Sequence, residues 1–233
     1  MNLRRPAVVA HRGASAHHPE NTLAAFEAAV EAGVDVIEFD VRWSADGALV
    51  VTHDPTELTL SEIRRLRPEM PTLDEVLEAL LGRVALEVEI KNVPGESTYE
   101  PAGSQIAREV LDALRRHAFA NAFVASFDAE TLRSVNELDG SRPTGLLVEP
   151  PTDLEGALEL SAGRDAFLLP DVTSLERAGS AFVERAHELG VQICVWTVDD
   201  PTAMKRVFEL GVDAVETNDP AVGVSVRDAC AQD

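Results

Sequence analysis

The 233-residue chain is poor in cysteine and has no long apolar run, and each shortage excludes a class of protein. Its two cysteines, Cys194 and Cys230, lie far apart, so we expect reduced thiols rather than a disulfide framework. No stretch of 18 apolar residues occurs, and the apolar run at residues 7–10 is too short for a signal-peptide core. The sequence therefore predicts a soluble, cytoplasmic protein without stable membrane association.

Basic residues are also scarce, since 20 Lys and Arg stand against 41 Asp and Glu, for a net charge of −21. Nucleic acids and anionic membranes are bound by basic patches, so we expect no nucleic-acid partner. An anionic small molecule would need a local positive site made of a few basic side chains and a metal ion. Only two of the basic residues are lysines, Lys91 and Lys205, which draws attention to Lys91 beside Glu89.

Short β-branched runs alternate with amphipathic stretches along the whole chain. We expect strands at residues 7–11, 34–40, 84–90, 122–126, 144–148, 166–169, 191–196 and 214–217. We expect helices at residues 22–32, 73–81, 104–117, 129–138, 154–161, 174–189, 201–210 and 221–230. This strict alternation is typical of a parallel sheet whose strands are connected by crossover helices.

Eight such units in this length match an α/β fold of the closed (β/α)8 TIM-barrel type, which typically has ~250 residues. An open doubly wound sheet is the alternative, but no glycine-rich dinucleotide fingerprint follows the first strand. No linker-like stretch divides the chain, so we expect residues 1–233 to form a single domain. One feature interrupts the alternation: Asp46-Gly47, flanked by apolar residues, predicts a small hairpin after the second strand. That hairpin would return His53 toward the strand end that carries Asp40.

Polar side chains gather where the predicted strands end, which is where TIM barrels carry their catalytic groups. The residues at these ends are His11, Arg12, Glu38, Asp40, His53, Glu89, Lys91, Ser126, Trp196 and Asn218. Because side chains alternate along a strand, Glu38 and Asp40 share one face, and so do Glu89 and Lys91. Glu38, Asp40 and Glu89 form an all-oxygen set, which predicts one divalent cation, Mg²⁺ or Ca²⁺.

The remaining residues at the strand ends have other chemistry. His11 and His53 titrate near neutrality, so one can accept a proton while the other donates one. Arg12 offers a planar, permanent charge for phosphate oxygens and Lys91 a point charge, although Lys91 could equally be a buried counter-ion. Trp196 is either part of the core or a wall of a substrate pocket. Together these residues predict acid–base cleavage of a phosphodiester.

The chain resembles the glycerophosphodiester phosphodiesterase family, in particular its small, single-domain bacterial and archaeal members, from about residue 7 to residue 222. The most specific block comprises His11-Arg12-Gly13-Ala14-Ser15, Pro19-Glu20-Asn21-Thr22, Gly33-Val34-Asp35, Ile37-Glu38-Phe39-Asp40-Val41, Asp46-Gly47 and His53-Asp54. Later matches are Glu89-Ile90-Lys91, Ser126-Phe127, Val195-Trp196-Thr197-Val198, Gly211-Val212-Asp213 and Thr217-Asn218-Asp219-Pro220.

The resemblance implies a TIM barrel that hydrolyses a glycerophosphodiester to sn-glycerol 3-phosphate and an alcohol with a divalent cation. It assigns Glu38, Asp40 and Glu89 as metal ligands, His11 and His53 as the catalytic pair, and Arg12 and Lys91 as phosphate-side residues. The chain departs from the family pattern at Asp199, where Asn is usual, and at Glu216, where an apolar residue is common. The segment between residues 53 and 71 is also shorter than is common in the family.

Three other readings remain open from the sequence. The same site could act as a lysophospholipase D, or as a cyclising phosphodiesterase that uses the glycerol 2-hydroxyl as an internal nucleophile. A barrel that binds phosphodiesters without cleaving them is the alternative outside enzymes, although such a protein would not need both His11 and His53, and both are present. The sequence also leaves a homo-oligomer open.

Overall fold

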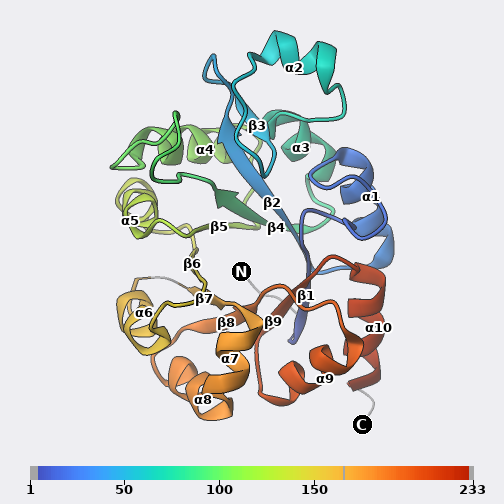
Figure 1. Ribbon diagram of the computed structural model, residues 1–233, viewed down its shortest axis with the longest axis vertical. Helices are drawn as coiled ribbons and strands as arrows, with labels where there is room; N and C mark the ends of the chain where they lie inside the picture. The colour runs from blue at the N-terminus through green and yellow to red at the C-terminus, as the bar shows by residue number, and fades with distance from the viewer. Residues whose placement is uncertain (1–4, 165, 231–233) are drawn as a thin grey trace.

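The computed structural model describes residues 5–164 and 166–230, and its centre is a closed ring of eight parallel strands (Figure 1). The ring consists of β1 (Ala7–Ala10), β2 (Val36–Trp43), β4 (Ala85–Ile90), β5 (Ala122–Ser126), β6 (Thr144–Val148), β7 (Phe167–Pro170), β8 (Gln192–Val195) and β9 (Ala214–Thr217). Strand β1 pairs with both β2 and β9, which closes the ring. The predicted TIM barrel is therefore confirmed, and the open sheet is wrong.

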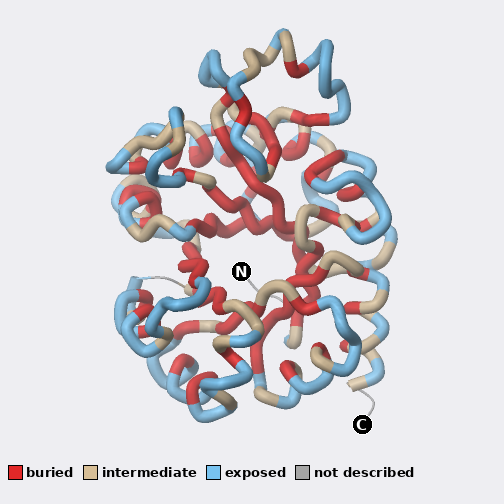
Figure 2. Tube along the Cα trace, in the orientation of Figure 1, coloured by how far each residue is buried: buried red, intermediate tan, exposed pale blue. Residues whose placement is uncertain are grey.

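Helices surround the ring on its outside (Figure 1). They are α1 (Leu23–Ala32), α2 (Leu60–Leu66), α3 (Leu73–Leu80), α4 (Ser104–Arg116), α5 (Ala129–Leu138), α6 (Leu154–Ser161), α7 (Val172–Ala178), α8 (Ser180–Glu188), α9 (Pro201–Glu209) and α10 (Pro220–Cys230). Figure 2 shows the strands and the inner faces of the helices buried, with the outer helical faces exposed. In the part of the chain that the structure describes, no helix is both long enough and apolar enough to cross a bilayer.

The hairpin predicted after the second strand is present. Strand β3 (Leu49–Val51) pairs antiparallel with the end of β2 and lies outside the ring. The Thr52 backbone N–H donates to the Asp40 carbonyl at 3.0 Å, so the chain returns His53 to the mouth of the barrel, as expected.

Two helix predictions were wrong. The single helix expected at residues 174–189 is two helices, α7 and α8, which meet at Gly179 with a φ of 75°. Helix α2 was not expected, although Thr59 and Glu62 form a capping box at its start. It has only seven residues, which is too short for a clear apolar periodicity.

Because side chains alternate along β2, its acidic side chains and its aromatic side chain point to opposite faces of the strand. Phe39 points away from the barrel axis and packs on Phe26 of α1, with ring centroids 5.7 Å apart. Glu38 and Asp40 point inward, and the parallel pairing places Glu38 beside Glu87 and Asp40 beside Glu89 of β4. The strand register therefore stacks four carboxylates in two adjacent rows inside the barrel.

Candidate active site

The three predicted metal ligands lie together at the floor of the barrel mouth. One carboxylate oxygen from each of Glu38, Asp40 and Glu89 lies within 4.8 Å of the others, and all three side chains are buried. Glu38 Oε1 has no hydrogen-bond partner among the described residues. Lys91 Nζ lies 3.1 Å from Asp40 Oδ1 and 2.6 Å from Glu89 Oε1, so this lysine is at least a buried counter-ion.

The electrostatics of this cluster differ from one acid to the next. Burial opposes ionisation of Asp40, but the positive charges of Lys91 and Arg12 outweigh it and lower its pKa. Burial, only partly offset by Lys91, raises the pKa of Glu89 to about 7. Burial and the neighbouring Asp40 raise the pKa of Glu38 well above its ordinary value. The positive charges of Lys91 and Arg12 are therefore too few to neutralise the three acids. Three carboxylate oxygens close together, with one further oxygen lacking a hydrogen bond, fit the ligand set of a divalent cation.

Arg12 lies beside the same cluster, and its own backbone has a strained, left-handed conformation. Its φ is +58°, and its backbone N–H donates to Glu38 Oε2 at 2.8 Å. Its Nε lies 3.3 Å from Asp40 Oδ2, and its Nη1 donates to both carboxylate oxygens of Glu20 at 3.0–3.1 Å. Gly13 follows with a φ of +79°, and a Cβ there would lie 2.7 Å from the Ala25 backbone. The turn after β1 therefore positions Arg12 beside the acids by a close approach to α1.

Asn21, which the sequence marked only as part of the family-like block, holds the central acid in place. Asn21 donates from Nδ2 to Asp40 Oδ2 at 2.8 Å and accepts from the Asp40 backbone N–H at 3.2 Å. Its left-handed φ of 59° turns the side chain toward β2 and leaves the cap of α1 to Thr22. The sequence signal was the match of Asn21 to the family block, without a role attached to it.

The hydrogen bonds around His11 fix its tautomer. His11 Nδ1 lies 2.8 Å from Asn218 Oδ1, and Asn218 Nδ2 donates to Asp199 Oδ2 at 2.7 Å. Because a carboxylate only accepts, Asp199 orients the Asn218 amide so that its oxygen faces the imidazole. His11 therefore carries its proton on Nδ1 and leaves Nε2 with a free lone pair. Burial and the nearby Arg12 charge lower the pKa of His11, which favours the neutral ring.

His53 lies in a more open position at the end of the hairpin. Its side chain is 39% exposed, and Nδ1 lies 3.2 Å from Asp54 Oδ1. Arg42 donates from Nε to the His53 backbone carbonyl at 2.7 Å and is ion-paired with Glu96. Arg42 was not predicted, yet it follows Glu38 and Asp40 at the strand spacing of two, which was the available signal.

A cavity of about 560 Å³ opens above this cluster. Its lining includes His11, Arg12, Arg42, His53, Glu89, Lys91, Phe127, Trp196 and Glu216. Trp196 donates from Nε1 to the Leu169 carbonyl at 2.7 Å and meets Phe127 edge to face at 5.5 Å. Lys91 Nζ lies 5.5 Å from the centre of the Phe127 ring. The cavity thus combines basic, imidazole and aromatic groups on one rim, and Trp196 is part of its wall.

Glu216 reaches the cavity from β9 and was not predicted as a site residue. It is buried, and Oε1 has no hydrogen-bond partner within the described ranges. Burial and the charges of Glu89 and Asp40 raise its pKa to about 8. The sequence marked the position only as a departure from the family pattern.

Known proteins are similar to this chain over nearly its whole length. Residues 11–222 match the model of the glycerophosphoryl diester phosphodiesterase family. The glycerophosphodiester phosphodiesterase of Caldanaerobacter subterraneus subsp. tengcongensis is 33% identical over 91% of this chain and 94% of that protein.

Solved structures show the same fold. The glycerophosphodiester phosphodiesterase from Parabacteroides distasonis superposes with a TM-score of 0.85 at 25% identity, covering 99% of this chain and all of that one. An Oleispira antarctica phosphodiesterase, solved with its product sn-glycerol-3-phosphate, superposes with a TM-score of 0.82 at 24% identity, covering 96% and 97% of the two chains. Since the family model and the 33% identical relative both span nearly the whole chain, this protein belongs to the glycerophosphoryl diester phosphodiesterase family of hydrolases.

Proposed function

We propose that this protein hydrolyses small glycerophosphodiesters to sn-glycerol 3-phosphate and an alcohol, with His11 and His53 as the acid–base pair. Glu38, Asp40 and Glu89 would hold one divalent cation, Mg²⁺ or Ca²⁺. The observation that carries the proposal is the convergence of these three carboxylates with both histidines and Arg12 at one cavity. The complex of the Oleispira antarctica protein with sn-glycerol-3-phosphate supports the choice of product.

His11 suits the role of general base. Its lowered pKa favours the neutral ring, and its Nε2 lone pair can accept a proton because Nδ1 bonds to Asn218. A water molecule next to the phosphorus would lose its proton to Nε2 as it attacks. The resulting imidazolium is stabilised by Asn218, whose amide oxygen accepts from Nδ1.

His53 suits the role of general acid for the departing alcohol. Its exposed position lets it regain a proton from solvent after each turnover. Arg12 and Lys91 would bind the non-bridging phosphate oxygens and hold the phosphorus near both imidazoles. A divalent cation bound to the three carboxylates would withdraw charge from the phosphoryl group.

The test is a coupled assay for glycerol 3-phosphate with glycerophosphocholine, glycerophosphoethanolamine, glycerophosphoglycerol and a lysolipid, each with and without chelator. We expect turnover of at least one small diester, loss of that turnover with chelator, and recovery with Mg²⁺ or Ca²⁺. Chelator-resistant turnover would remove the cation from the proposal. A cyclic phosphate product would show that the glycerol 2-hydroxyl attacks instead of water.

The roles of the two imidazoles are tested by His11→Ala and His53→Ala, each expected to lower kcat by roughly 10²-fold or more. The matched control is His18→Ala, because His18 lies exposed on the loop after β1. Full activity in both catalytic variants would refute the acid–base pair.

A further inference from the structure

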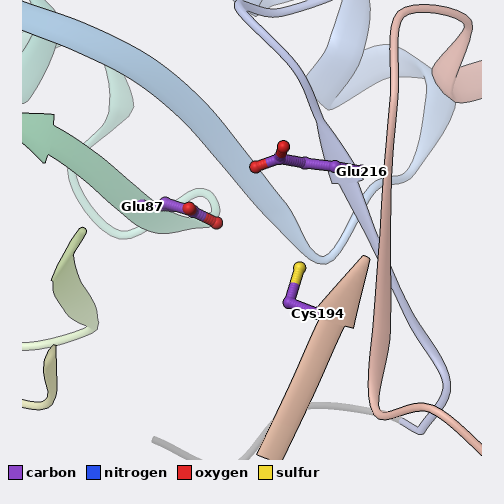
Figure 3. Close-up of side chains that lie close together, drawn as sticks. All are labelled: Glu87, Cys194 and Glu216. Atoms are coloured by element: carbon purple, nitrogen blue, oxygen red, sulfur yellow. The ribbon is translucent and has the colours of Figure 1, made fainter. Parts of the chain in front are cut away.

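A second group of ligand-type side chains lies within the barrel interior. It consists of Glu87 of β4, Cys194 of β8 and Glu216 of β9, all fully or almost fully buried. One ligand atom from each lies within 4.8 Å of the other two. Figure 3 shows the two carboxylates and the thiol pointing into one common space from different strands.

The polar atoms of this group lack outside partners. Both oxygens of Glu87, and Oε1 of Glu216, accept no hydrogen bond from any described residue, so that each carboxyl group has only the other carboxyl group to pair with. Glu87 is 0% exposed, so water reaches neither oxygen. An ionised carboxylate in such a place is strongly destabilising unless a cation neutralises it. The surrounding barrel interior is apolar, with Val9, Ala125 and Leu169 among its buried residues.

The donor types identify the kind of cation. One sulfur and two carboxylates form a softer set than the three carboxylates of Glu38, Asp40 and Glu89. Magnesium and calcium prefer oxygen alone, whereas Zn²⁺ binds cysteine sulfur together with carboxylate oxygen. We propose that Glu87, Cys194 and Glu216 form a second metal site inside the barrel, which binds Zn²⁺ or a similar borderline transition-metal ion.

The charges of the barrel interior agree with two cations. Five buried carboxylates and one thiolate carry six negative charges when all are ionised: Glu38, Asp40, Glu87, Glu89, Glu216 and Cys194. Lys91 and Arg12 provide two positive charges against them. Two divalent ions provide the remaining four. Binding at the second site releases the Cys194 thiol proton, and any proton held by the carboxyl groups of Glu87 and Glu216, to solvent.

The ion has a route of entry and a structural effect. Glu216 lines the 560 Å³ cavity and also belongs to the deeper group, so an ion would enter from this cavity past the Glu216 carboxylate. Strand β4 lies on the other side of β1 and β2 from β8 and β9 in the ring order. An ion bound by side chains of β4, β8 and β9 would therefore connect strands on two sides of the ring and stabilise the folded barrel.

The test uses the spectrum of Co²⁺ alone, added to the full chain after removal of bound metal. A thiolate ligand gives cobalt a ligand-to-metal charge-transfer band that an all-oxygen site cannot produce. We expect this band to saturate at one equivalent per chain and to disappear when Zn²⁺ displaces Co²⁺. Because no turnover is measured, failure of the proposed phosphodiesterase function would leave this result unaffected.

Variants assign the band to its residues. Cys194→Ala should abolish it, whereas Cys230→Ala on α10 is the matched control and should retain it. Glu216→Gln keeps the thiol and the side-chain shape, and should weaken Zn²⁺ binding by more than about 100-fold, beyond the loss typical of a residue outside the ligand set. This second variant carries the test if Cys194→Ala does not fold.

Three results would overturn the inference. They are Co²⁺ binding without a thiolate band, a band that survives Cys194→Ala, and unchanged Zn²⁺ affinity in Glu216→Gln. Co²⁺ binding without a thiolate band is the result expected if Glu87 and Glu216 share a proton and hold no metal ion.

Discussion

The hydrogen bond from His11 to Asn218 permits a prediction in which two separate readouts must agree. Asn218→Ala removes the acceptor of His11 Nδ1 and frees the ring to adopt either tautomer. A neutral hydrogen bond contributes about 0.5–1.5 kcal/mol, and the upper part of that range corresponds to a tenfold change in rate. We therefore expect kcat/KM to fall by roughly 10-fold.

The second readout is the pH dependence. A general base must be unprotonated, so kcat/KM falls as the pH drops through the pKa of His11. The bond to Asn218 raises that pKa, although burial and Arg12 hold it below its ordinary value. Without Asn218 the pKa falls further, so the acid limb of the profile should move to lower pH. The variant would thus lose activity at neutral pH while retaining a larger share of it in acid.

The assay is the coupled measurement of glycerol 3-phosphate across the acid limb, at saturating divalent cation. Ser15→Ala is the matched control, because the Ser15 hydroxyl lies 2.7 Å from the His11 backbone carbonyl and 2.9 Å from Asn218 Oδ1, and its removal leaves the bond between the imidazole and Asn218 intact. An unchanged kcat/KM together with an unmoved acid limb in Asn218→Ala would refute the reasoning that His11 acts as base through a tautomer held by Asn218.

Three further perturbations follow from the site and its supporting turn. Arg12→Ala should weaken product inhibition by glycerol 3-phosphate, and inhibition equal to the native level would mean that the phosphate binds elsewhere. Arg42→Ala, which frees the His53 carbonyl, should lower kcat/KM by about 10-fold, and Arg42→Lys should restore part of it; equal activity in all three proteins would contradict a positioning role. Gly13→Ala should destabilise the fold by roughly 2–4 kcal/mol in thermal unfolding, because the new Cβ meets Ala25. Gly47→Ala, with a similar φ of +82° but nothing within 4 Å, is its control and should cost only about 1–2 kcal/mol.

The barrel and the first layer of the site could be predicted because both depend on local patterns. Strand and helix periodicity, with the length of the chain, indicated the eightfold alternation, and the carboxyl ends of the strands then named Glu38, Asp40 and Glu89. The predicted convergence of these acids with both histidines required only that parallel strands end on the same side. The exceptions were local too: α2 was too short to show a period, and Gly179 interrupted a stretch whose apolar spacing continued across it.

The roles of the supporting residues could not be predicted because they depend on contacts between distant segments. Asn218 meets His11 across 207 positions of sequence, and Asp199 orients that amide from a different loop. Asn218 was named as a strand-end residue and Asp199 as a departure from the family pattern, but nothing in the sequence indicated that the two side chains would meet or that Asn218 would meet His11. Asn21 was similarly hidden, because an asparagine before a helix usually caps it, whereas here a left-handed φ turns it toward Asp40.

The stability of the barrel and its chemistry depend on the same strand register. Pairing of β2 with β4 places Glu38 beside Glu87 and Asp40 beside Glu89, so the ladder that closes the sheet also forces carboxylates together. Two basic side chains leave most of that charge unbalanced, and burial makes the imbalance expensive. Cations bound at the two proposed sites would therefore contribute to folding as well as to catalysis, since they would bind the native register and not the unfolded chain. The protein should accordingly lose thermal stability and turnover together when its metals are removed, and regain the turnover with Mg²⁺ or Ca²⁺ alone but the full stability only when Zn²⁺ is also supplied.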